Sequence, residues 1–183
     1  SLWAENLQSL AGWLGPNGHV ICYPIGKGDM INLFCGHVTD QWVEESWSIE
    51  SDPQELRDAY SNVHPDLRLI LARVPRCFKW GVFDRDPLPQ WTRGCATLLG
   101  DAAHPMLPFL AQGAAMAIED AAVLAASLAR TPDDPAAAFR RYESVRRGRT
   151  AKVQQAARRN SAIYHMSGIP ALARNLVLRT SSA

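Results

Sequence analysis

The stretch TLLGDAAHPMLPFLAQGAAMAIED, from Thr97 to Asp120, decides how the rest of the chain is organised. The residues around its start, Ala96 to Leu99, form a short apolar run that predicts a buried strand. Gly100 permits a tight exit from that strand, and Asp101 places a carboxylate just past its end. The first part of the stretch therefore predicts a strand that runs into an acidic turn.

The second part of the stretch predicts an extended loop and then a helix. Pro105 and Pro108 restrict the backbone of the loop, and Gly113 closes it. A run of Ala, Met and Ile then indicates a helix over Ala114–Ala129. A strand, an acidic turn and a helix start in this order are typical of cofactor sites. The carboxylate accepts hydrogen bonds from ribose-like hydroxyls, and the free N–H groups of a helix start attract anions.

The same residues resemble the second flavin-binding motif of single-component FAD-dependent aromatic hydroxylases, the salicylate and hydroxybenzoate hydroxylase type. Three segments with defined spacing carry the resemblance: Gly100–Pro105, Ala111–Ala114 and Ile118–Ala121. The flanking sequence agrees as well, at Lys79, Trp80, Pro87–Trp91, Tyr142, Glu143, Arg146 and Arg149. The resemblance covers most of the chain, but it corresponds only to the C-terminal half of such an enzyme.

The Gly-x-Gly-x-x-Gly turn with which these enzymes bind the ADP part of FAD is missing from the sequence. Gly26 and Gly28 supply its first half, but Ile31 stands where the third glycine belongs. The family's Asp-Gly pair beside the pyrophosphate is missing too, and the chain starts at Ser1 rather than at a methionine. We therefore expect a fragment whose partner is the missing N-terminal half of the same enzyme.

The resemblance implies an α+β fold, in which the antiparallel sheet of the substrate domain joins a strand and long helices that complete the FAD-binding domain. This is an incomplete glutathione-reductase-like flavoprotein fold that lacks its N-terminal βαβ unit. Residues 1–92 are expected to form part of the substrate domain, residues 93–130 the second FAD-binding motif, and residues 131–183 a C-terminal helical segment. A truncated sheet leaves an exposed edge, through which we expect a homodimer to form.

The activity implied by the resemblance is hydroxylation of a small aromatic substrate, a phenolic or heteroaromatic acid. NADH or NADPH reduces FAD, O2 adds to the flavin C4a carbon, and the hydroperoxide hydroxylates the ring, while the protein supplies orientation and charge stabilisation. Two alternatives stay open: a related non-hydroxylating flavoprotein oxidoreductase, and an inactive module without bound FAD. We expect the isolated fragment to bind FAD weakly and to be inactive, because the missing unit would supply the pyrophosphate contacts.

The resemblance also implies which residues hold the flavin. Asp101 would bond the ribityl chain, and Pro105 and Pro108 would shape the wall beside the isoalloxazine ring. The backbone N–H groups of the helix start would face the flavin N1 and C2 carbonyl, which carry negative charge in reduced flavin. The cofactor-binding candidates are Gly100, Asp101, Pro105, Gln112, Gly113, Ala114 and Ala115.

His104 and Pro105 are the candidates for a catalytic role, because both lie near the flavin in the motif. None of the other histidines lies at metal-ligand spacing from His104, so no metal site is expected. A Ser-His-Asp site would need a nucleophile elbow, which the sequence lacks. We interpret His104 as a residue that shapes the loop, with a proton-transfer role as the alternative.

Candidates for substrate contact come from two parts of the chain. The strands predicted at His19–Ile25 and Met30–Gly36, joined by a hairpin turn at Gly26–Asp29, resemble the sheet that roofs the aromatic substrate. The candidates are Cys22, Ile31, Leu33, Trp80, Pro108, Phe109 and Leu110. Cys22, Ile31 and Leu33 could equally well be ordinary core residues of the sheet. A buried tryptophan such as Trp80 is also more often a core residue than a ligand contact.

The remaining elements follow from periodicity and capping signals. We expect helices over Leu2–Leu14, from Pro53 after a Ser51 or Asp52 cap, over His64–Ala72, from Pro135 after an Asp133 or Asp134 cap, and over Pro170–Arg179, with a strand at Cys77–Phe83. In the helix after Pro135, Glu143 and Arg146 are three residues apart, which predicts an ion pair between them.

Composition argues against several classes of function. Hydrophobic residues make up 47% of the 183, which argues against disorder, and a formal net charge of +1 argues against a chain built to bind polyanions. The basic run from Arg140 to Arg159 lacks interleaved aromatics beyond Tyr142. A solvated helix face, or a surface that packs on the missing half, therefore explains this run better than a nucleic-acid groove.

The four cysteines, Cys22, Cys35, Cys77 and Cys95, show no Cys-x-x-Cys pairing and are expected to stay free thiols in a reducing compartment. No apolar run reaches the roughly 18 residues of a membrane span, and no secretory signal precedes Trp3. We therefore expect a cytoplasmic protein without membrane or nucleic-acid partners.

Overall fold

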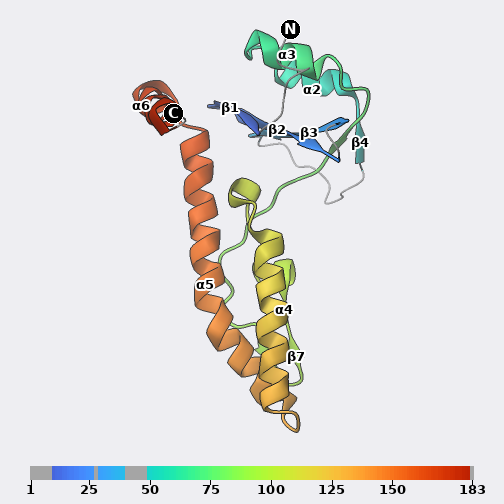
Figure 1. Cartoon of the computed structure of the whole chain (residues 1–183), viewed down its shortest axis with the longest axis vertical. Coiled ribbons are helices and arrows are strands. Elements are labelled where there is room, and N and C mark those ends of the chain that lie inside the picture. The colour runs from blue at the N-terminus through green and yellow to red at the C-terminus, as the bar shows by residue number, and fades with distance from the viewer. Residues whose placement is uncertain (1–9, 27–28, 40–48, 182–183) are drawn as a thin grey trace. The chain divides into compact units, whose positions relative to one another are not determined.

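The computed structural model describes residues 10–26, 29–39 and 49–181, which fall into two compact units (Figure 1). One unit comprises residues 1–81 together with 163–183, and the other comprises residues 82–162. The three-way division of the chain expected at residues 92 and 130 stays a prediction. Over the described residues, no helix combines the length and apolar character needed to cross a membrane.

A three-stranded antiparallel sheet forms the centre of the first unit, in the order β1-β2-β3. Its strands are β1 (Ala11–Gly15), β2 (Gly18–Ile25) and β3 (Met30–His37). The hairpin predicted from the alternating residues is confirmed, because β2 and β3 pair along their whole length, with Ile25 opposite Met30.

The helix predicted over Leu2–Leu14 is wrong from Ala11 onward, where the chain forms β1; residues 2–9 lie outside the described part. Pro16 and Asn17 form a tight turn that brings Gly15 opposite Gly18. This turn pairs the preceding residues with β2, and strand pairing overrides the helix-like spacing of the leucines.

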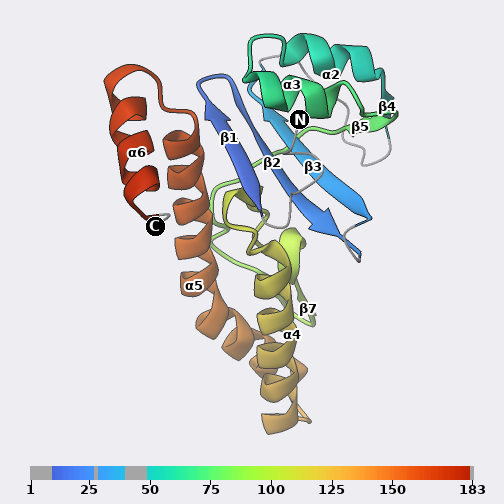
Figure 2. The same cartoon turned by 45° about the horizontal axis from the view of Figure 1, so that its top comes forward.

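Two helices, α2 (Pro53–Ala59) and α3 (Pro65–Leu71), cover one face of this sheet (Figure 2). Both predicted helix starts are confirmed, and the Asp52 side chain caps α2 by accepting a hydrogen bond from the N–H of Gln54 at 2.8 Å. The core between helices and sheet consists of Val20, Tyr60, Leu67 and Leu71, against which Trp13, Leu33, Cys35, Leu56 and Val63 pack.

Shorter elements complete the first unit. The strand β4 (Ile49–Ser51) pairs with β5 (Cys77–Lys79), and the strand predicted to reach Phe83 ends at Lys79, which lies opposite Ile49, the first described residue of β4. The predicted C-terminal helix is confirmed as α6 (Gly168–Ser181). Arg174 anchors α6 by donating to the carbonyl oxygen of Tyr164 at 2.7 Å.

The second unit is built from two long helices that lie side by side, α4 (Gly113–Arg130) and α5 (Pro135–Tyr164) (Figure 1). The last two residues of α5, 163 and 164, belong to the first unit. They follow a small hairpin of β6 (Thr92–Arg93) and β7 (Ala96–Thr97). Two short 3₁₀ helices, η1 (Gly100–Ala102) and η2 (Pro108–Leu110), lie between β7 and α4.

The core of the second unit joins α5 to the segment around the hairpin. Trp91, Ala103 and Tyr142 are buried together, and the Tyr142 hydroxyl donates to the Leu98 carbonyl oxygen at 3.2 Å. The buried strand predicted over Ala96–Leu99 is only partly found. The strand β7 ends at Thr97, and Leu98 is 37% exposed. Among the described residues only the two-residue strand β6 pairs with β7, so β7 is not covered as a central strand of a sheet would be.

Candidate functional site

A tight turn follows β7 and carries Asp101. Gly100 has φ +60°, and its carbonyl oxygen accepts hydrogen bonds from the backbone N–H groups of Ala103 and His104, both at 2.9 Å. A side chain at Gly100 would be strained at this φ, and its Cβ would lie 3.3 Å from the Cβ of Ala117. The glycine therefore serves both the turn and the close approach of α4, while Asp101 stays exposed to solvent.

The Asp101 carboxylate lies beside the start of α4. A Cβ placed on Gly113 would lie 3.9 Å from Asp101 Oδ1, with nothing else within 4 Å. Among the described side chains none caps this helix start, and its first internal hydrogen bond runs from Met116 N–H to the Gln112 carbonyl at 2.9 Å. The N–H groups of the three residues before Met116 thus have no acceptor within the helix, next to a carboxylate.

The loop between the turn and α4 is held by α5. Buried Gln154 donates from Nε2 to the Pro105 carbonyl oxygen at 2.8 Å, and Asn160 donates from Nδ2 to the Phe109 carbonyl oxygen at 3.2 Å. The loop ends at Ala111, whose φ of 51° is left-handed and unusual for a residue with a side chain. Such strain persists only where the surroundings hold it in place.

A buried charge cluster lies behind the turn. The carboxylate of Asp120, 0% exposed, accepts hydrogen bonds at Oδ2 from the Gly100 N–H at 3.1 Å and from His104 Nε2 at 2.6 Å. Its Oδ1 accepts from Arg146 Nε at 2.6 Å. Burial alone would raise the pKa of Asp120, but the hydrogen bonds from Arg146, His104 and Gly100 outweigh it and lower the pKa below its ordinary value.

Glu119 extends the cluster to the surface. Arg146 and Arg149 both pair with Glu119, and Arg149 holds both carboxylate oxygens at 2.6 Å. Hydrogen bonds from Arg149 and then Arg146 lower the pKa of Glu119 to about 2. The cluster therefore joins one carboxylate in the core and one at the surface through the single guanidinium of Arg146.

The ion pair predicted between Glu143 and Arg146 is wrong. Glu143 instead accepts a hydrogen bond from the Thr92 N–H at 2.9 Å and pairs with Arg147 at 3.6 Å. The physical reason is that the buried carboxylate of Asp120 needs a cation, and Arg146 turns into the core to supply it.

His104 is almost fully buried at 1% exposure, and its ring is used within the protein. Its Nε2 is bonded to Asp120, while its buried Nδ1 has no hydrogen-bond partner among the described residues. Over the same residues, no group of three or more His, Cys, Asp and Glu side chains is arranged to hold a metal ion. The loop-shaping role and the proton-transfer role of His104 both stay predictions.

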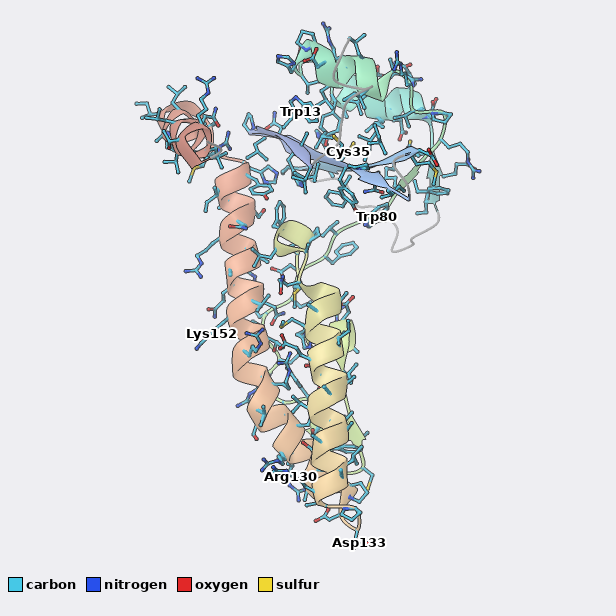
Figure 3. All side chains as sticks on the ribbon, viewed as in Figure 1. Trp13, Cys35, Trp80, Arg130, Asp133 and Lys152 are labelled. Carbon is cyan, nitrogen blue, oxygen red and sulfur yellow. The ribbon has the colours of Figure 1, made fainter. Side chains whose placement is uncertain are left out.

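The substrate candidates of the first unit lie on opposite faces of the sheet. Cys22 stands opposite Leu33, on the same face as Val20 and the helix-covered core, and Ile31 lies two residues further along that face. Trp80 lies on the other side of the sheet, where its ring centroid is 6.3 Å from that of Phe34 (Figure 3). In the second unit, Pro108, Phe109 and Leu110 form η2.

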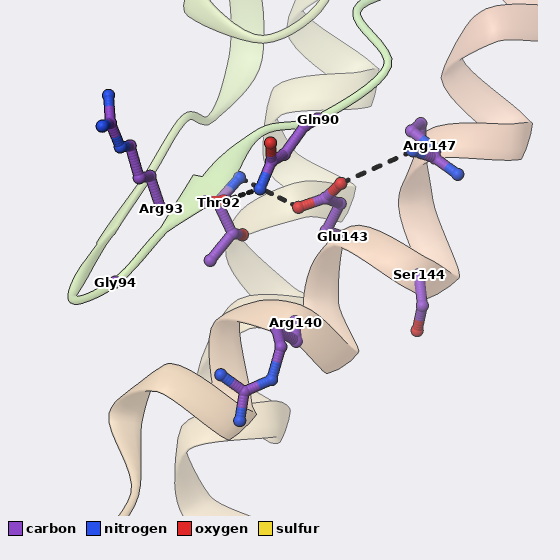
Figure 4. A pocket seen from close by; sticks show the side chains of 8 residues that line it. All are labelled: Gln90, Thr92, Arg93, Gly94, Arg140, Glu143, Ser144 and Arg147. Carbon is purple, nitrogen blue, oxygen red and sulfur yellow. Dashed lines mark hydrogen bonds and ion pairs between the residues drawn. The ribbon is translucent and has the colours of Figure 1, made fainter.

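An open pocket of about 440 Å³ lies elsewhere in the second unit (Figure 4). It is lined by Gln90, Thr92, Arg93, Gly94, Arg140, Glu143, Ser144 and Arg147. Glu143 lies in its middle with its carboxylate already bonded, and the guanidinium groups of the three arginines point away from one another. None of the predicted flavin or substrate residues lines this pocket, so we do not place the chemistry there.

The turn, the loop and the uncapped helix lie within residues 10–158, which match the protein family described as FAD binding domain. The chain belongs to this FAD-binding family. The resemblance to the aromatic hydroxylases seen in the sequence is thereby confirmed, and so is FAD as the cofactor of the family.

Curated relatives of this member of the FAD-binding family include aromatic monooxygenases. It is 40% identical over 158 residues to 3-amino-4-hydroxybenzoate 2-monooxygenase PtnB3 of Streptomyces platensis, covering 86% of the chain and 40% of the relative. It is 43% identical over 152 residues to 6-hydroxynicotinate 3-monooxygenase of Bordetella bronchiseptica, covering 81% of the chain and 39% of the relative. The chain thus spans about two fifths of the length of these relatives.

Solved structures agree with these relatives. A salicylate hydroxylase substrate complex superposes with a TM-score of 0.81 at 28% identity, covering 94% of this chain and 46% of that one. Klebsiella pneumoniae HpxO complexed with FAD and uric acid gives a TM-score of 0.75 at 26% identity, covering 94% of this chain and 44% of the HpxO chain. This member of the FAD-binding family therefore shares the mixed helix and sheet fold of flavoprotein hydroxylases, as expected, while the finer fold description stays a prediction.

Proposed function

We propose that the chain forms the flavin-ring end of the cofactor site in an FAD-dependent aromatic monooxygenase. The observation that carries the proposal is the Asp101 carboxylate beside the uncapped start of α4, where Gly113 leaves space that a Cβ would occupy. A carboxylate suits hydroxyl groups and free N–H groups suit a carbonyl or an anion, so these residues fit the ribityl chain and the ring edge of FAD.

Each residue of the site has a stated task in the proposal. Asp101 accepts hydrogen bonds from the ribityl hydroxyls, and the N–H groups of Gly113, Ala114 and Ala115 face the N1 and C2 carbonyl edge of the ring. The positive end of the α4 dipole stabilises the negative charge that reduced flavin carries there. When bound, FAD supplies the redox chemistry that activates O2 and delivers oxygen to an aromatic ring, with NADH or NADPH as the proposed reductant.

The proposed substrate is a small aromatic acid, the class named in the relatives described above. Trp80, Pro108, Phe109 and Leu110 are the proposed contacts. The pairing of Trp80 with Phe34 on the face away from α2 and α3 supports Trp80. Cys22, Ile31 and Leu33 lie on the helix-covered face, which favours the core interpretation for them.

Titration with FAD, followed by flavin fluorescence, tests the proposal. The chain is measured alone and mixed with the N-terminal part of one of its relatives. We expect Asp101→Ala to weaken saturable binding, whereas Asp133→Ala, which removes an exposed carboxylate at the turn between α4 and α5, should not change it. Absence of FAD binding in both preparations, or equal binding by Asp101→Ala, would overturn the proposal.

A further inference from the structure

A single carboxylate oxygen holds both ends of the turn that carries Asp101. Asp120 Oδ2 accepts hydrogen bonds from the Gly100 N–H at 3.1 Å and from His104 Nε2 at 2.6 Å. Asp101 lies between these two anchored residues. The stretch of backbone that carries the Asp101 side chain is thus anchored at both ends to the buried carboxylate of Asp120.

The position of Asp120 is set in turn by Arg146, whose guanidinium is fully engaged. Arg146 Nε binds Asp120 Oδ1 at 2.6 Å, Nη1 binds Glu119, and Nη2 donates to the Met116 carbonyl oxygen at 3.2 Å. Its side chain is 4% exposed. With every nitrogen of its planar fork bonded to α4, the Arg146 side chain has one arrangement in which all its partners are satisfied.

We propose that Asp120 and Arg146 are positioning residues for the flavin site, which hold Asp101 at the start of α4 through the Gly100–His104 turn. The inference rests on the proposed function, in which Asp101 binds the ribityl chain of FAD. Neither Asp120 nor Arg146 touches the flavin in this assignment. They act through the backbone of Gly100 and the ring of His104.

Stability alone does not account for such a cluster. Burying an aspartate, an arginine and a histidine costs desolvation energy that their mutual attraction offsets only when the geometry is excellent, and apolar residues often fill such a space equally well. The charged groups add directional hydrogen bonds, because both carboxylate oxygens are acceptors and each donor must approach them along a defined line. The geometry therefore suits a cluster that holds the turn bearing Asp101 in one position.

Arg149 is a matched control for Arg146. Both arginines belong to α5, and both pair with Glu119, but Arg149 is exposed and has no bond to Asp120. We expect Arg146→Gln to accelerate hydrogen exchange of the Gly100 and His104 amides by about tenfold to a hundredfold, the range for losing a hydrogen bond to a charged group. Arg149→Gln should leave the exchange of both amides unchanged.

His104 offers a second pair of variants that separates the hydrogen bond from the space the ring fills. His104→Gln keeps an N–H donor that can reach Asp120, whereas His104→Leu keeps the bulk and removes the donor. We expect fast exchange at Gly100 in His104→Leu and near wild-type exchange in His104→Gln. Failure of the glutamine to restore protection, or acceleration spread evenly over α4 and α5 in Arg146→Gln, would overturn the inference.

The link to the flavin is tested by a double-mutant cycle on FAD affinity, in the preparation that binds FAD. If Arg146 acts through Asp101, Arg146→Gln weakens FAD binding in the wild-type background and has little further effect once Asp101→Ala is present. Additive losses would overturn the inference. If no preparation binds FAD while the amides respond as stated, the proposed function fails and the anchoring of the turn by Asp120 stands.

Discussion

Gln154 of α5 donates a hydrogen bond from Nε2 to the carbonyl oxygen of Pro105 at 2.8 Å, and the same nitrogen lies 3.3 Å from the carbonyl oxygen of Arg85. One buried amide thus joins the loop proposed to face the flavin ring to the first residues of the second unit. Proline carbonyls have no helix or sheet partner in such a loop, so the side chain supplies the donor.

Gln154→Leu should therefore lower the free energy of unfolding by about 1–3 kcal/mol, the cost of leaving buried carbonyl groups without a donor. It should also weaken FAD binding, because the loop that carries Pro105 loses its link to α5. Gln155→Leu is the control, since Gln155 is the exposed neighbour on the same helix. Urea unfolding followed by circular dichroism and the FAD titration measure the two effects, and equal losses in both variants would contradict the prediction.

Gly100→Ala should destabilise the chain more than Gly94→Ala. Both glycines have positive φ, +60° and +59°, so alanine costs about 1–2 kcal/mol of backbone strain at either position. Only at Gly100 would the new Cβ lie 3.3 Å from the Cβ of Ala117, whereas it meets nothing within 4 Å at Gly94. The difference in urea midpoint between the variants measures the crowding against α4, and identical midpoints would exclude it.

Gly113→Ala should separate binding from stability. Alanine favours the helix over glycine by up to about 1 kcal/mol, so α4 should not be weakened. Its Cβ would nevertheless stand 3.9 Å from Asp101 Oδ1, in the space assigned to the flavin. We expect the affinity for FAD to fall by about tenfold or more, a change worth only about 1.4 kcal/mol.

Gly148→Ala is the control for this prediction, because Gly148 lies on α5 with nothing within 4 Å of the added Cβ. It should raise helix stability without changing the FAD titration. A Gly113→Ala variant that binds FAD as tightly as Gly148→Ala would show that the start of α4 does not face the cofactor.

Local chemistry predicted much of this fold because several elements are specified by adjacent residues. Asp52 followed by Pro53 caps and starts α2, and the alternating strands around Gly26 pair as a hairpin. Such signals need no knowledge of distant residues. The strand β1 was missed because its pairing with β2 is decided by the turn at Pro16 and Asn17, which competes with the leucine spacing.

In the candidate site, too, the features specified by adjacent residues could be predicted and those that depend on distant residues could not. The order of Asp101, the loop and the start of α4 could be predicted, since one continuous stretch contains them. Arg146 was expected to pair with Glu143 on its own helix, because its actual partner Asp120 lies 26 positions away in the sequence. A signal for Asp120 did exist: a carboxylate on the apolar side of a helix requires a buried donor.

Glu119→Gln should reduce the dependence of stability on acidic pH. Arg149 and Arg146 lower the pKa of Glu119 from 4.5 to about 2, so the unfolded chain binds more protons than the folded chain in this window. Stability from this carboxylate is present above pH 4.5 and is lost as the pH falls toward 2. Thermal unfolding across that range should show a shallower loss in Glu119→Gln than in the wild type, and parallel curves would contradict the prediction.

A histidine pair should make the first unit sensitive to mildly acidic pH. His19 Nδ1 lies 3.1 Å from His165 Nε2, and burial, followed by the charge of His165, lowers the pKa of His19 from 6.5 to about 4. The unfolded chain therefore binds a proton between pH 6.5 and 4 that the folded chain does not, so stability falls as the pH is lowered, by at most about 1.4 kcal/mol per pH unit.

Replacing the titrating ring tests this dependence. His19→Gln should flatten the loss of unfolding free energy between pH 6.5 and 4, whereas His37→Gln, at an exposed position of β3, should keep the wild-type slope. Urea unfolding at several pH values in this range measures both slopes. Because a buried neutral histidine must gain its proton on unfolding, a wild-type slope that survives in His19→Gln would assign the acid sensitivity to other groups.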